Sequence, residues 1–562
     1  MKKYITKKIS EQKSINNLNK AYSALLFENG FTDPISISEN LPDFKTKKNW
    51  LSKFLQNDMS YLSGTKEFAD IVNANKDKHF CIIGDYDADG IMATTIMKLA
   101  FDSLGIKCSY LIPNRLEDGY GMKEIHVDQA LEIKADIIIT VDNGITEPGV
   151  VEYAHKKGLI TIITDHHLPE SDNIPKADLL IDPHLTNDSM KYICGAYVAL
   201  KLVLGLIDVN DPSNDYFIRD LAMFAAVATI TDVMPLVKEN RLLVKYVLEN
   251  MNFIRGKNIW AGRTMKFLSG FGNSYMMKDL DKLITEDTFG YYIGPTLNAS
   301  GRINGEVTQI VQDIINAGEY KTYINGYYQI NRERQDKTRS LLKEYEVEGL
   351  PISFSILDAS KFDFPIHGLM GLVASRVSSE EQKPAFIGVK KDTGGISFSC
   401  RSPLGYSLHE GFNRIQETGL IEISGGGHDG AMGINLHKEE QLDLLRELLT
   451  RDYEENSQIA EEVVYEFEPE FIEEIFEAHR ELQPFGQEFR GLNFKITGEY
   501  QGYDTDEKTL LIDGYSFKSF IPVTDLPEFG SNVEAIFKIG IDSKTINYFK
   551  IDELRTLEEE IV

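Results

Sequence analysis

The chain has little cysteine, little tryptophan and no long hydrophobic run. Of its 562 residues, four are cysteine and two are tryptophan. The four cysteines lie far apart and form no Cys-x-x-Cys pair, which argues against a disulfide framework or a zinc knuckle. No segment reaches the ~18 consecutive apolar residues of a transmembrane helix, and the N-terminus lacks the apolar stretch of a secretory signal. We therefore expect a protein of the reducing cytoplasm that does not attach to a membrane.

Positive charge is also scarce. Lys and Arg number 59 against 87 Asp and Glu, which gives a net charge of −28. Because phosphate backbones favour a basic surface, this balance disfavours tight nonspecific binding to nucleic acid. The acidic excess is largest at the C-terminal end, where residues 451–562 hold 27 acidic and 10 basic residues, a net charge of −17. The first 450 residues carry the remaining −11, which still allows a narrow basic channel.

Strand-like and helix-like patterns alternate from about residue 75 onward. Short β-branched runs of this kind are typical of buried parallel strands, and their alternation with helices predicts a doubly wound parallel sheet. The expected strands are 80–84, 109–113, 137–141, 160–164 and 177–181. The expected helices are 91–104, 123–133, 147–157, 195–206 and 216–230.

A chain of this length implies several domains. Mixed charge over 307–348 indicates a long helical connector. The glycine-rich turns that follow, over about 351–452, indicate a second α/β unit. Short strand-like runs after Pro484-Phe485-Gly486 predict a small barrel resembling an oligonucleotide-binding (OB) barrel. We predict a helical lead-in at 1–60, a parallel-sheet domain at 61–255, the connector at 256–350, the second α/β domain at 351–455, and a linker helix with the barrel at 456–562.

Three acidic segments each follow one of the expected strands. They are Asp85-Tyr86-Asp87-Ala88-Asp89-Gly90, Asp142-Asn143-Gly144 and Asp165-His166-His167. Ligands of an open parallel sheet gather at the carboxyl ends of its strands, so these side chains should converge in one crevice. Oxygen ligands with one or two imidazoles suit manganese or magnesium. The pattern therefore predicts a metal site suited to two-metal phosphoryl hydrolysis.

Each segment also has a simpler interpretation. Asp142 alone could be the N-cap of the helix that follows it. The first segment resembles half an EF-hand, but no Glu stands at the twelfth position of that loop. His166 and His167 could be exposed turn residues; on an extended chain they would point in different directions, one toward a metal and one toward substrate. Asp232, at the end of helix 216–230, would be a fourth acidic ligand or an ordinary loop residue.

In combination, these segments and Thr231-Asp232 resemble the four ordered motifs of the DHH phosphoesterases. Further segments resemble the RecJ-type single-strand-specific exonucleases within that superfamily. These are Gly195-Ala196-Tyr197-Val198-Ala199, Leu297-Asn298-Ala299-Ser300-Gly301-Arg302, Gly371-Leu372-Val373-Ala374-Ser375-Arg376, Ser399-Cys400-Arg401-Ser402 and Gly425-Gly426-Gly427-His428. The resemblance extends from about residue 45 to residue 500.

The resemblance implies roles for particular residues. Two manganese ions, with magnesium as the alternative, would be bound by Asp85, Asp87, Asp89, Asp142, His166 and Asp232. Asp142 would bridge the ions. The catalytic residues would be Asp142, Asp165 and His167, of which His167 would contact the scissile phosphate or assist the leaving oxygen. Substrate phosphates would be bound by Arg302, Ser375, Arg376, Ser399, Arg401, Gly426, Gly427 and His428. Arginine suits phosphate because its fork is bidentate, although an isolated arginine is more often part of a surface ion pair.

The activity implied is metal-dependent 5′-to-3′ exonucleolytic hydrolysis of single-stranded DNA to 5′-mononucleotides, in DNA repair and recombination, by a monomer. The alternatives are a phosphodiesterase for short oligonucleotides or cyclic dinucleotides and a non-catalytic replication scaffold. Two departures from the family pattern stand out. Asp429-Gly430 follows His428 where the family has Ala-Met, and the barrel region is acidic. We expect this barrel to contact a protein partner, or DNA through a limited basic or aromatic face.

Overall fold

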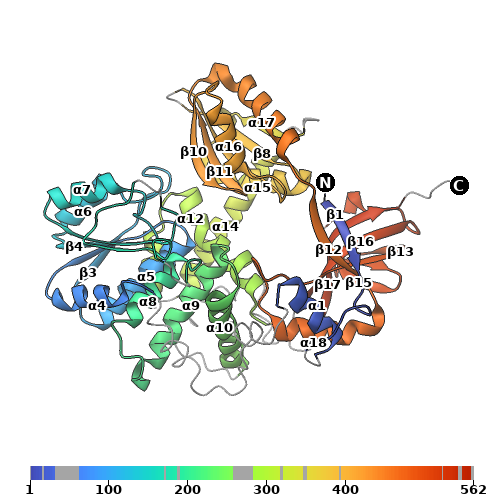
Figure 1. Cartoon of the computed structure of the whole chain (residues 1–562), viewed down its shortest axis with the longest axis horizontal. Coiled ribbons are helices and arrows are strands. Elements are labelled where there is room, and N and C mark those ends of the chain that lie inside the picture. Colours follow the sequence, from blue (N-terminus) through green and yellow to red (C-terminus); the bar gives the residue numbers. More distant parts are fainter. Residues whose placement is uncertain are drawn as a thin grey trace.

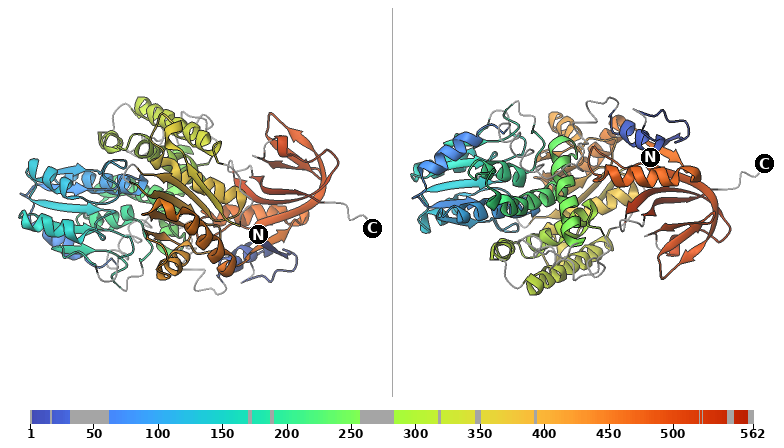
Figure 2. Two further views of the ribbon diagram at one scale, coloured as in Figure 1. Left: turned by 90° about the horizontal axis from the view of Figure 1, so that it is seen from above. Right: turned by 90° about the horizontal axis from the view of Figure 1, so that it is seen from below.

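The computed structural model describes residues 2–15, 18–31, 62–169, 173–186, 190–256, 283–316, 320–345, 351–391, 394–519, 521, 523–541 and 547–557. The predictions for 32–61 and 257–282 lie outside these residues. Within them, no helix has the length and apolar character needed to cross a membrane. The parallel-sheet domain and the C-terminal strands lie at opposite ends of the molecule (Figure 2).

The first α/β domain has the predicted parallel sheet, with strand order β3-β2-β4-β5-β6 (Figure 1). The strands are β2 (Phe80–Ile83), β3 (Cys108–Leu111), β4 (Ile137–Val141), β5 (Ile160–Thr164) and β6 (Leu179–Ile181). Successive strand residues point to opposite faces, and helices cover both. On one face lie α6 (Glu124–Glu132) and α7 (Pro148–Lys156). On the other lie α5 (Ala88–Ser103), α8 (Gly195–Leu204) and α9 (Asp215–Thr231), with α4 (Thr65–Ala74) beside them.

Helices connect this domain to the rest of the chain, as the mixed-charge region predicted. α10 (Lys238–Gly256) follows α9 at the end of the first domain, and the first helical turn of the connector in the described residues is π-helical, η3 (Thr288–Ile293). The connector then contains α12 (Gly294–Ile303), α13 (Thr308–Asn316) and the long α14 (Tyr320–Leu342). α12 packs on α14 and on η3, so the connector forms one helical body between the two α/β domains.

The second α/β domain has a mixed sheet with strand order β10-β11-β9-β8-β7, in which only β7 and β8 pair in parallel. Its strands are β7 (Ser353–Leu357), β8 (Ala385–Lys390), β9 (Ile396–Arg401), β10 (Ile423–His428) and β11 (Ala431–Leu436). One face packs on α15 (Met370–Glu381). The other packs on α16 (Leu408–Glu417) and α17 (Leu442–Asn456).

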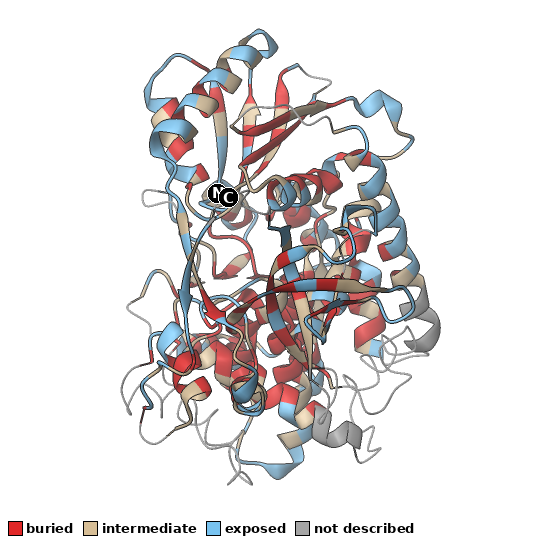
Figure 3. Ribbon diagram, turned by 90° about the vertical axis from the view of Figure 1, so that its right-hand side faces the viewer, coloured by how far each residue is buried: buried red, intermediate tan, exposed pale blue. Residues whose placement is uncertain are grey.

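Five C-terminal strands pair in a closed ring, β13-β14-β15-β17-β16 and back to β13. They are β13 (Asn493–Asp504), β14 (Thr509–Ile512), β15 (Tyr515–Lys518), β16 (Asn532–Ile541) and β17 (Asn547–Thr556). The strands alternate between buried and exposed residues (Figure 3). This ring, called the barrel below, follows α18 (Ile472–Leu482).

The expectation of a helical lead-in over residues 1–60 is wrong for the first residues. β1 (Lys2–Lys7) is a strand that pairs in parallel with β12 (Ala460–Glu466), and α1 (Lys20–Glu28) packs on α18. Lys3 donates a hydrogen bond to Glu461, 458 positions later in the chain. Because the partner strand is so distant in sequence, the local polar pattern around residues 2–7 gave no indication of the pairing.

Candidate functional site

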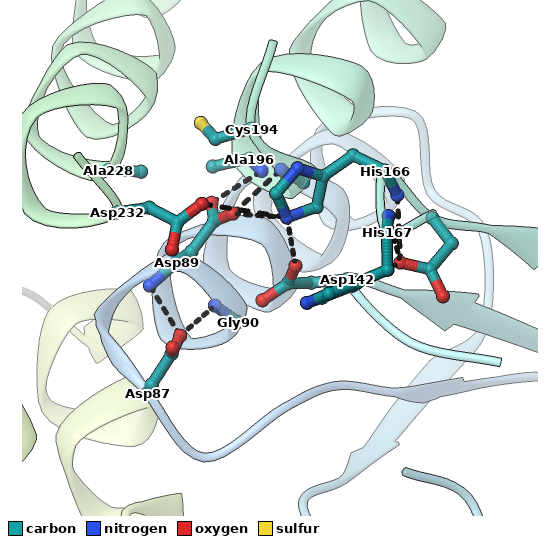
Figure 4. A network of polar contacts seen from close by, with 12 residues as sticks. Asp87, Asp89, Gly90, Asp142, His166, His167, Cys194, Ala196, Ala228 and Asp232 are labelled. Carbon is teal, nitrogen blue, oxygen red and sulfur yellow. Dashed lines mark hydrogen bonds and ion pairs between the residues drawn. The ribbon is translucent and has the colours of Figure 1, made fainter. Parts of the chain in front are cut away.

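The acidic segments and Asp232 meet at the carboxyl edge of the parallel sheet (Figure 4). The segments leave the neighbouring strands β2, β4 and β5, and Asp232 caps the C-terminus of α9. In each of three groups of residues, the potential ligand atoms lie within 4.8 Å of one another. The groups are Asp85, Asp87 and Asp142; Asp89, His166 and Asp232; and Asp142, His166 and His167. All six residues predicted as metal ligands thus belong to one cluster, which we call the carboxylate cluster.

His166 lies at the centre of this cluster. Its Nε2 is 3.1 Å from Asp142 Oδ1, 3.5 Å from Asp89 Oδ2 and 3.6 Å from Asp232 Oδ2. Burial is the main cause that lowers the pKa of His166, to about 3. The imidazole is therefore neutral, and a neutral imidazole nitrogen is the form that binds a metal ion.

The carboxylates of the cluster repel one another in a buried environment. Burial, and then neighbouring carboxylates, raise the pKa of Asp142 and Asp232 well above the usual range. The same causes raise the pKa of Asp89 to about 6. Asp85 Oδ1 is buried and accepts no hydrogen bond from the described residues, and the buried Asp142 Oδ1 has the His166 ring nitrogen beside it but accepts no hydrogen bond either. An oxygen-rich set whose buried oxygens accept no hydrogen bond, with one neutral imidazole, fits a hard divalent cation.

The backbone at Asp142 is held in an unusual conformation. Asp142 has a φ of 64°, in the left-handed region that few non-glycine residues occupy. The buried Asn143 amide donates to the carbonyls of Ile83 and Val141, at 3.0 Å each, and fixes this turn to β2. A Cβ at Gly195 would lie 2.6 Å from Asp142 Oδ1, so glycine there lets α8 approach the carboxylate.

Asp87 and Asp89 also bind backbone amides. Asp87 Oδ1 accepts from the amides of Asp89 and Gly90, at 2.9 and 3.2 Å, and so caps α5. The two Asp89 oxygens accept from the amides of Gly195 and Ala196, at 2.7 Å each. Asp89 therefore ties the first turn of α5 to the start of α8 (Figure 4). Sequence reasoning did not anticipate this link, since it joins residues more than 100 positions apart.

His167 has different partners from His166. Its Nδ1 lies 2.7 Å from Asp165 Oδ1 and 2.9 Å from the hydroxyl of Tyr120. Burial opposes protonation of His167, but the hydrogen bond and charge of Asp165 outweigh it and raise the pKa to about 10. The ring is thus held by Asp165 beside the carboxylate cluster. The sequence analysis did not identify Tyr120 as a site residue. Glycines stand on both sides of it in the sequence, and in the structure Gly119 and Gly121 have positive φ.

Arg302, a predicted phosphate-binding residue, lies close enough to Asp87 of the carboxylate cluster to feel its charge. Burial and then the charges of Arg115, Arg334 and Arg401 lower its pKa to about 9, although the charge of Asp87 opposes them. The positive charges of the four arginines thus act on one another close to Asp87. Arg115 also stacks on the ring of Tyr86, at 4.7 Å from its centroid. Sequence reasoning missed Arg115, whose signal is its place just after β3.

The other predicted phosphate-binding residues belong to the second α/β domain. Ser375 and Arg401 line one pocket of about 370 Å³. Ser399 is on β9, and the run from Gly426 to His428 is on the exposed part of β10. Arg376 instead forms an ion pair with Glu380, and its side chain is 64% exposed. The structure thus groups Arg302 with Arg401 and leaves Arg376 on the surface of α15.

The altered segment after His428 makes a local contact. The Ser407 hydroxyl, which caps α16, donates to Asp429 Oδ1, and the Leu408 amide donates to the Asp429 carbonyl at 2.9 Å. The Asp429 carboxylate therefore stabilises the start of α16.

Comparisons with known proteins agree on one family. The family model for the DHH family, N-terminal domain, matches residues 79–229, and that for the DHHA1 domain matches residues 366–455. The single-stranded-DNA-specific exonuclease RecJ of Escherichia coli K12 is 31% identical over 76% of this chain and 77% of its own length. The corresponding protein of Salmonella typhimurium LT2 is 29% identical over 82% of this chain and 84% of its own length. The crystal structure of RecJ from Thermus thermophilus in complex with Mn²⁺ has the same fold, with a TM-score of 0.72 over 96% of this chain and 76% of that chain, at 22% identity.

Proposed function

Because this chain belongs to the RecJ family of DHH phosphoesterases, it is a hydrolase of phosphodiester bonds, and we propose that its substrate is single-stranded DNA. We further propose that it shortens the strand from the 5′ end to 5′-mononucleotides, in DNA repair and recombination, as a cytoplasmic monomer. The observation that carries the proposal is the carboxylate cluster with its neutral His166, beside a group of four arginines.

We propose that two manganese ions, or magnesium in their place, bind to Asp85, Asp87, Asp89, Asp142, His166 and Asp232. Two features support this. The buried oxygens Asp85 Oδ1 and Asp142 Oδ1 accept no hydrogen bond from the described residues, and the carboxylate oxygens that accept from backbone amides each keep a second lone pair. Such ions polarise a phosphoryl oxygen and lower the pKa of water when bound.

The chain's own groups supply the remaining chemistry. Asp165 keeps His167 protonated through Nδ1, so His167 carries a positive charge at the scissile phosphate and can donate a proton to the leaving oxygen. Tyr120 limits rotation of the same ring. Arg302 and Arg401 bind substrate phosphates, because partly desolvated guanidinium groups recognise phosphate through paired hydrogen bonds. Ser375, Arg376, Ser399, Gly426, Gly427 and His428 are proposed as further phosphate contacts.

The test follows end-labelled single-stranded DNA and RNA, labelled at either end, with the full-length protein and manganese. We expect mononucleotides to be released from the 5′ end of DNA, and we expect chelation of the metal to stop the reaction. Asp142→Ala serves as the matched inactive variant. Cleavage restricted to dinucleotides or cyclic dinucleotides, or no cleavage at all, would contradict the proposal.

A further inference from the structure

Pro484-Phe485-Gly486-Gln487, called the 484–487 segment below, joins α18 to the barrel and contacts the loop that follows Asp232. Leu236 comes four positions after Asp232, and its amide donates a hydrogen bond of 2.7 Å to the carbonyl of Gln487. A Cβ at Gly486 would lie 2.8 Å from Leu236 Cδ1, so glycine lets the segment lie directly against this buried leucine. The contact links a predicted metal ligand to a segment far away in the sequence.

The backbone just after Asp232 has an unusual conformation. Val233 has a φ of 55°, in the left-handed region, where a β-branched residue is rare. Its amide donates to the Ile230 carbonyl at 3.2 Å, and the Met234 amide donates to the Thr229 carbonyl at 3.0 Å. These are the two hydrogen bonds of a Schellman motif, whose left-handed position is usually glycine. A valine stays in such a conformation only where the surrounding structure holds it there.

Two adjacent side chains of α10 hold this loop and the C-terminal segment. The amide group of the buried Asn240 donates to the Pro235 carbonyl at 3.0 Å. The guanidinium group of Arg241, which is also buried, donates to the carbonyls of Leu482 and Pro484. The loop after α9 and the start of the 484–487 segment are therefore fixed to the same turn of α10.

The 484–487 segment is also held from other directions. Glu286 Oε1 accepts a hydrogen bond of 2.8 Å from the Phe485 amide, and the Phe485 ring stacks on the Phe489 ring with centroids 5.7 Å apart. The backbones of Gly486 and Phe489 form hydrogen bonds to each other in both directions, at 2.8 and 3.3 Å. The segment is thus a tight, anchored turn, and the direction of its Gln487 carbonyl is fixed.

We propose that the 484–487 segment positions the metal ligand Asp232. By holding the Leu236 amide, it keeps Val233 in the left-handed conformation and so sets the direction in which the end of α9 presents the Asp232 carboxylate to the cluster (Figure 4). This role rests on the proposed function and deepens it, because metal affinity then depends on residues that lie outside the carboxylate cluster. Outer contacts that orient a metal ligand typically affect metal affinity by about 10- to 100-fold.

The test measures the manganese affinity of the full-length protein from the EPR signal of free Mn²⁺ during a titration. It compares wild type with Gly486→Ala and Gly486→Val, which place side-chain atoms where Leu236 lies. We expect affinity to fall by about 10- to 100-fold in Gly486→Val and by less in Gly486→Ala, the variant that disturbs folding less. At a fixed, limiting manganese concentration kcat should fall with the bound metal, while KM for single-stranded DNA stays within about 2-fold of wild type.

Gly530→Ala is the matched control. Gly530 lies in the loop before β16 and has a φ of 84°, and no atom of the described residues lies within 4 Å of an added Cβ. Alanine there strains the backbone without touching Leu236, so it should lower the melting temperature and leave manganese affinity unchanged.

A second-site variant tests the route through the backbone. Glycine adopts the left-handed conformation without strain, so Val233→Gly keeps the turn after α9 even when the contact with Leu236 is disturbed. Val233→Gly combined with Gly486→Val should therefore recover most of the manganese affinity that Gly486→Val loses.

The outcomes separate the positioning role from the proposed function. If wild type binds manganese and both Gly486 variants bind it as Gly530→Ala does, the 484–487 segment has a purely structural role and the proposed function stands. Failure of Val233→Gly to recover any affinity would also refute the positioning role, because the loss would then not pass through the turn after α9. If wild type binds no manganese, the proposed metal site fails first, and the positioning role fails with it.

Discussion

The two α/β domains use five-stranded sheets in different ways. The first sheet is entirely parallel, so β2, β4 and β5 all end at one edge and bring their acidic segments together there. The second sheet is mixed, and its predicted phosphate-binding residues are distributed over α15, β9 and the exposed end of β10. A parallel sheet concentrates chemistry at one edge, whereas a mixed sheet presents a broad surface. Substitutions should therefore have severe effects in the first domain and graded effects in the second.

The largest effect is expected at the centre of the parallel-sheet edge. Asp142→Ala should reduce manganese-dependent hydrolysis by on the order of 10³-fold or more, because it removes a carboxylate that belongs to two of the groups of potential ligands. The metal-free variant should melt at the same temperature as wild type or higher, since a buried and repelled carboxylate has been removed. Manganese should then raise the melting temperature of wild type more than that of the variant.

His166→Ala is the matched second variant for this prediction. It should also lose hydrolysis and the manganese-induced stabilisation. Near wild-type cleavage by either purified variant with manganese would refute the assignment of the cluster as the metal site.

The next effect concerns His167, which lies beside the cluster. His167→Ala should lower kcat by roughly 10²- to 10³-fold through loss of a general acid, while manganese still raises the melting temperature. Tyr120→Phe keeps the ring and removes only the hydroxyl that lies 2.9 Å from His167 Nδ1, so we expect a decrease of about 3- to 10-fold. Single-turnover kinetics with saturating manganese measure both. If His167→Ala also abolished manganese binding, His167 would be a ligand and the division of roles between the two histidines would be wrong.

A smaller effect should distinguish the arginines. Arg302 lies close enough to Arg115, Arg334, Arg401 and Asp87 for their charges to shift its pKa, so Arg302→Gln should lower kcat/KM for single-stranded DNA by about 10- to 100-fold. Arg376 forms an exposed ion pair with Glu380, and exposed pairs contribute little, so Arg376→Gln should change kcat/KM by less than about 3-fold. Equal losses in the two variants would mean that substrate phosphates extend over the outer face of α15.

The parts of the fold and site that could be predicted from the sequence are those that depend on local patterns. The strands that lead to Asp85, Asp142 and Asp165 are short apolar runs, and the parallel sheet follows from local patterns. Features that depend on contacts between segments far apart in the chain could not be predicted. The pairing of β1 with β12, the amide contacts of Asp89 and the convergence of Arg115 on Arg302 all join segments far apart in the chain. Local periodicity carries no information about such contacts.

The smallest effect is expected at Asp429, where the second domain departs from the family pattern. A carboxylate beside a phosphate-binding segment would normally repel substrate. Here it accepts a hydrogen bond from Ser407 at the N-terminus of α16, so Asp429→Ala should change kcat/KM by less than about 3-fold and reduce the free energy of unfolding by about 0.5–1 kcal/mol. Denaturant unfolding and exonuclease kinetics on the same samples measure both quantities. Ser407→Ala is the matched control, because it removes the other half of the contact and should give a similar loss of stability. A gain in activity of 10-fold or more in Asp429→Ala would instead show that the carboxylate faces the substrate. In that case one residue of the second domain would strongly affect substrate binding, as single residues of the first domain are expected to affect hydrolysis.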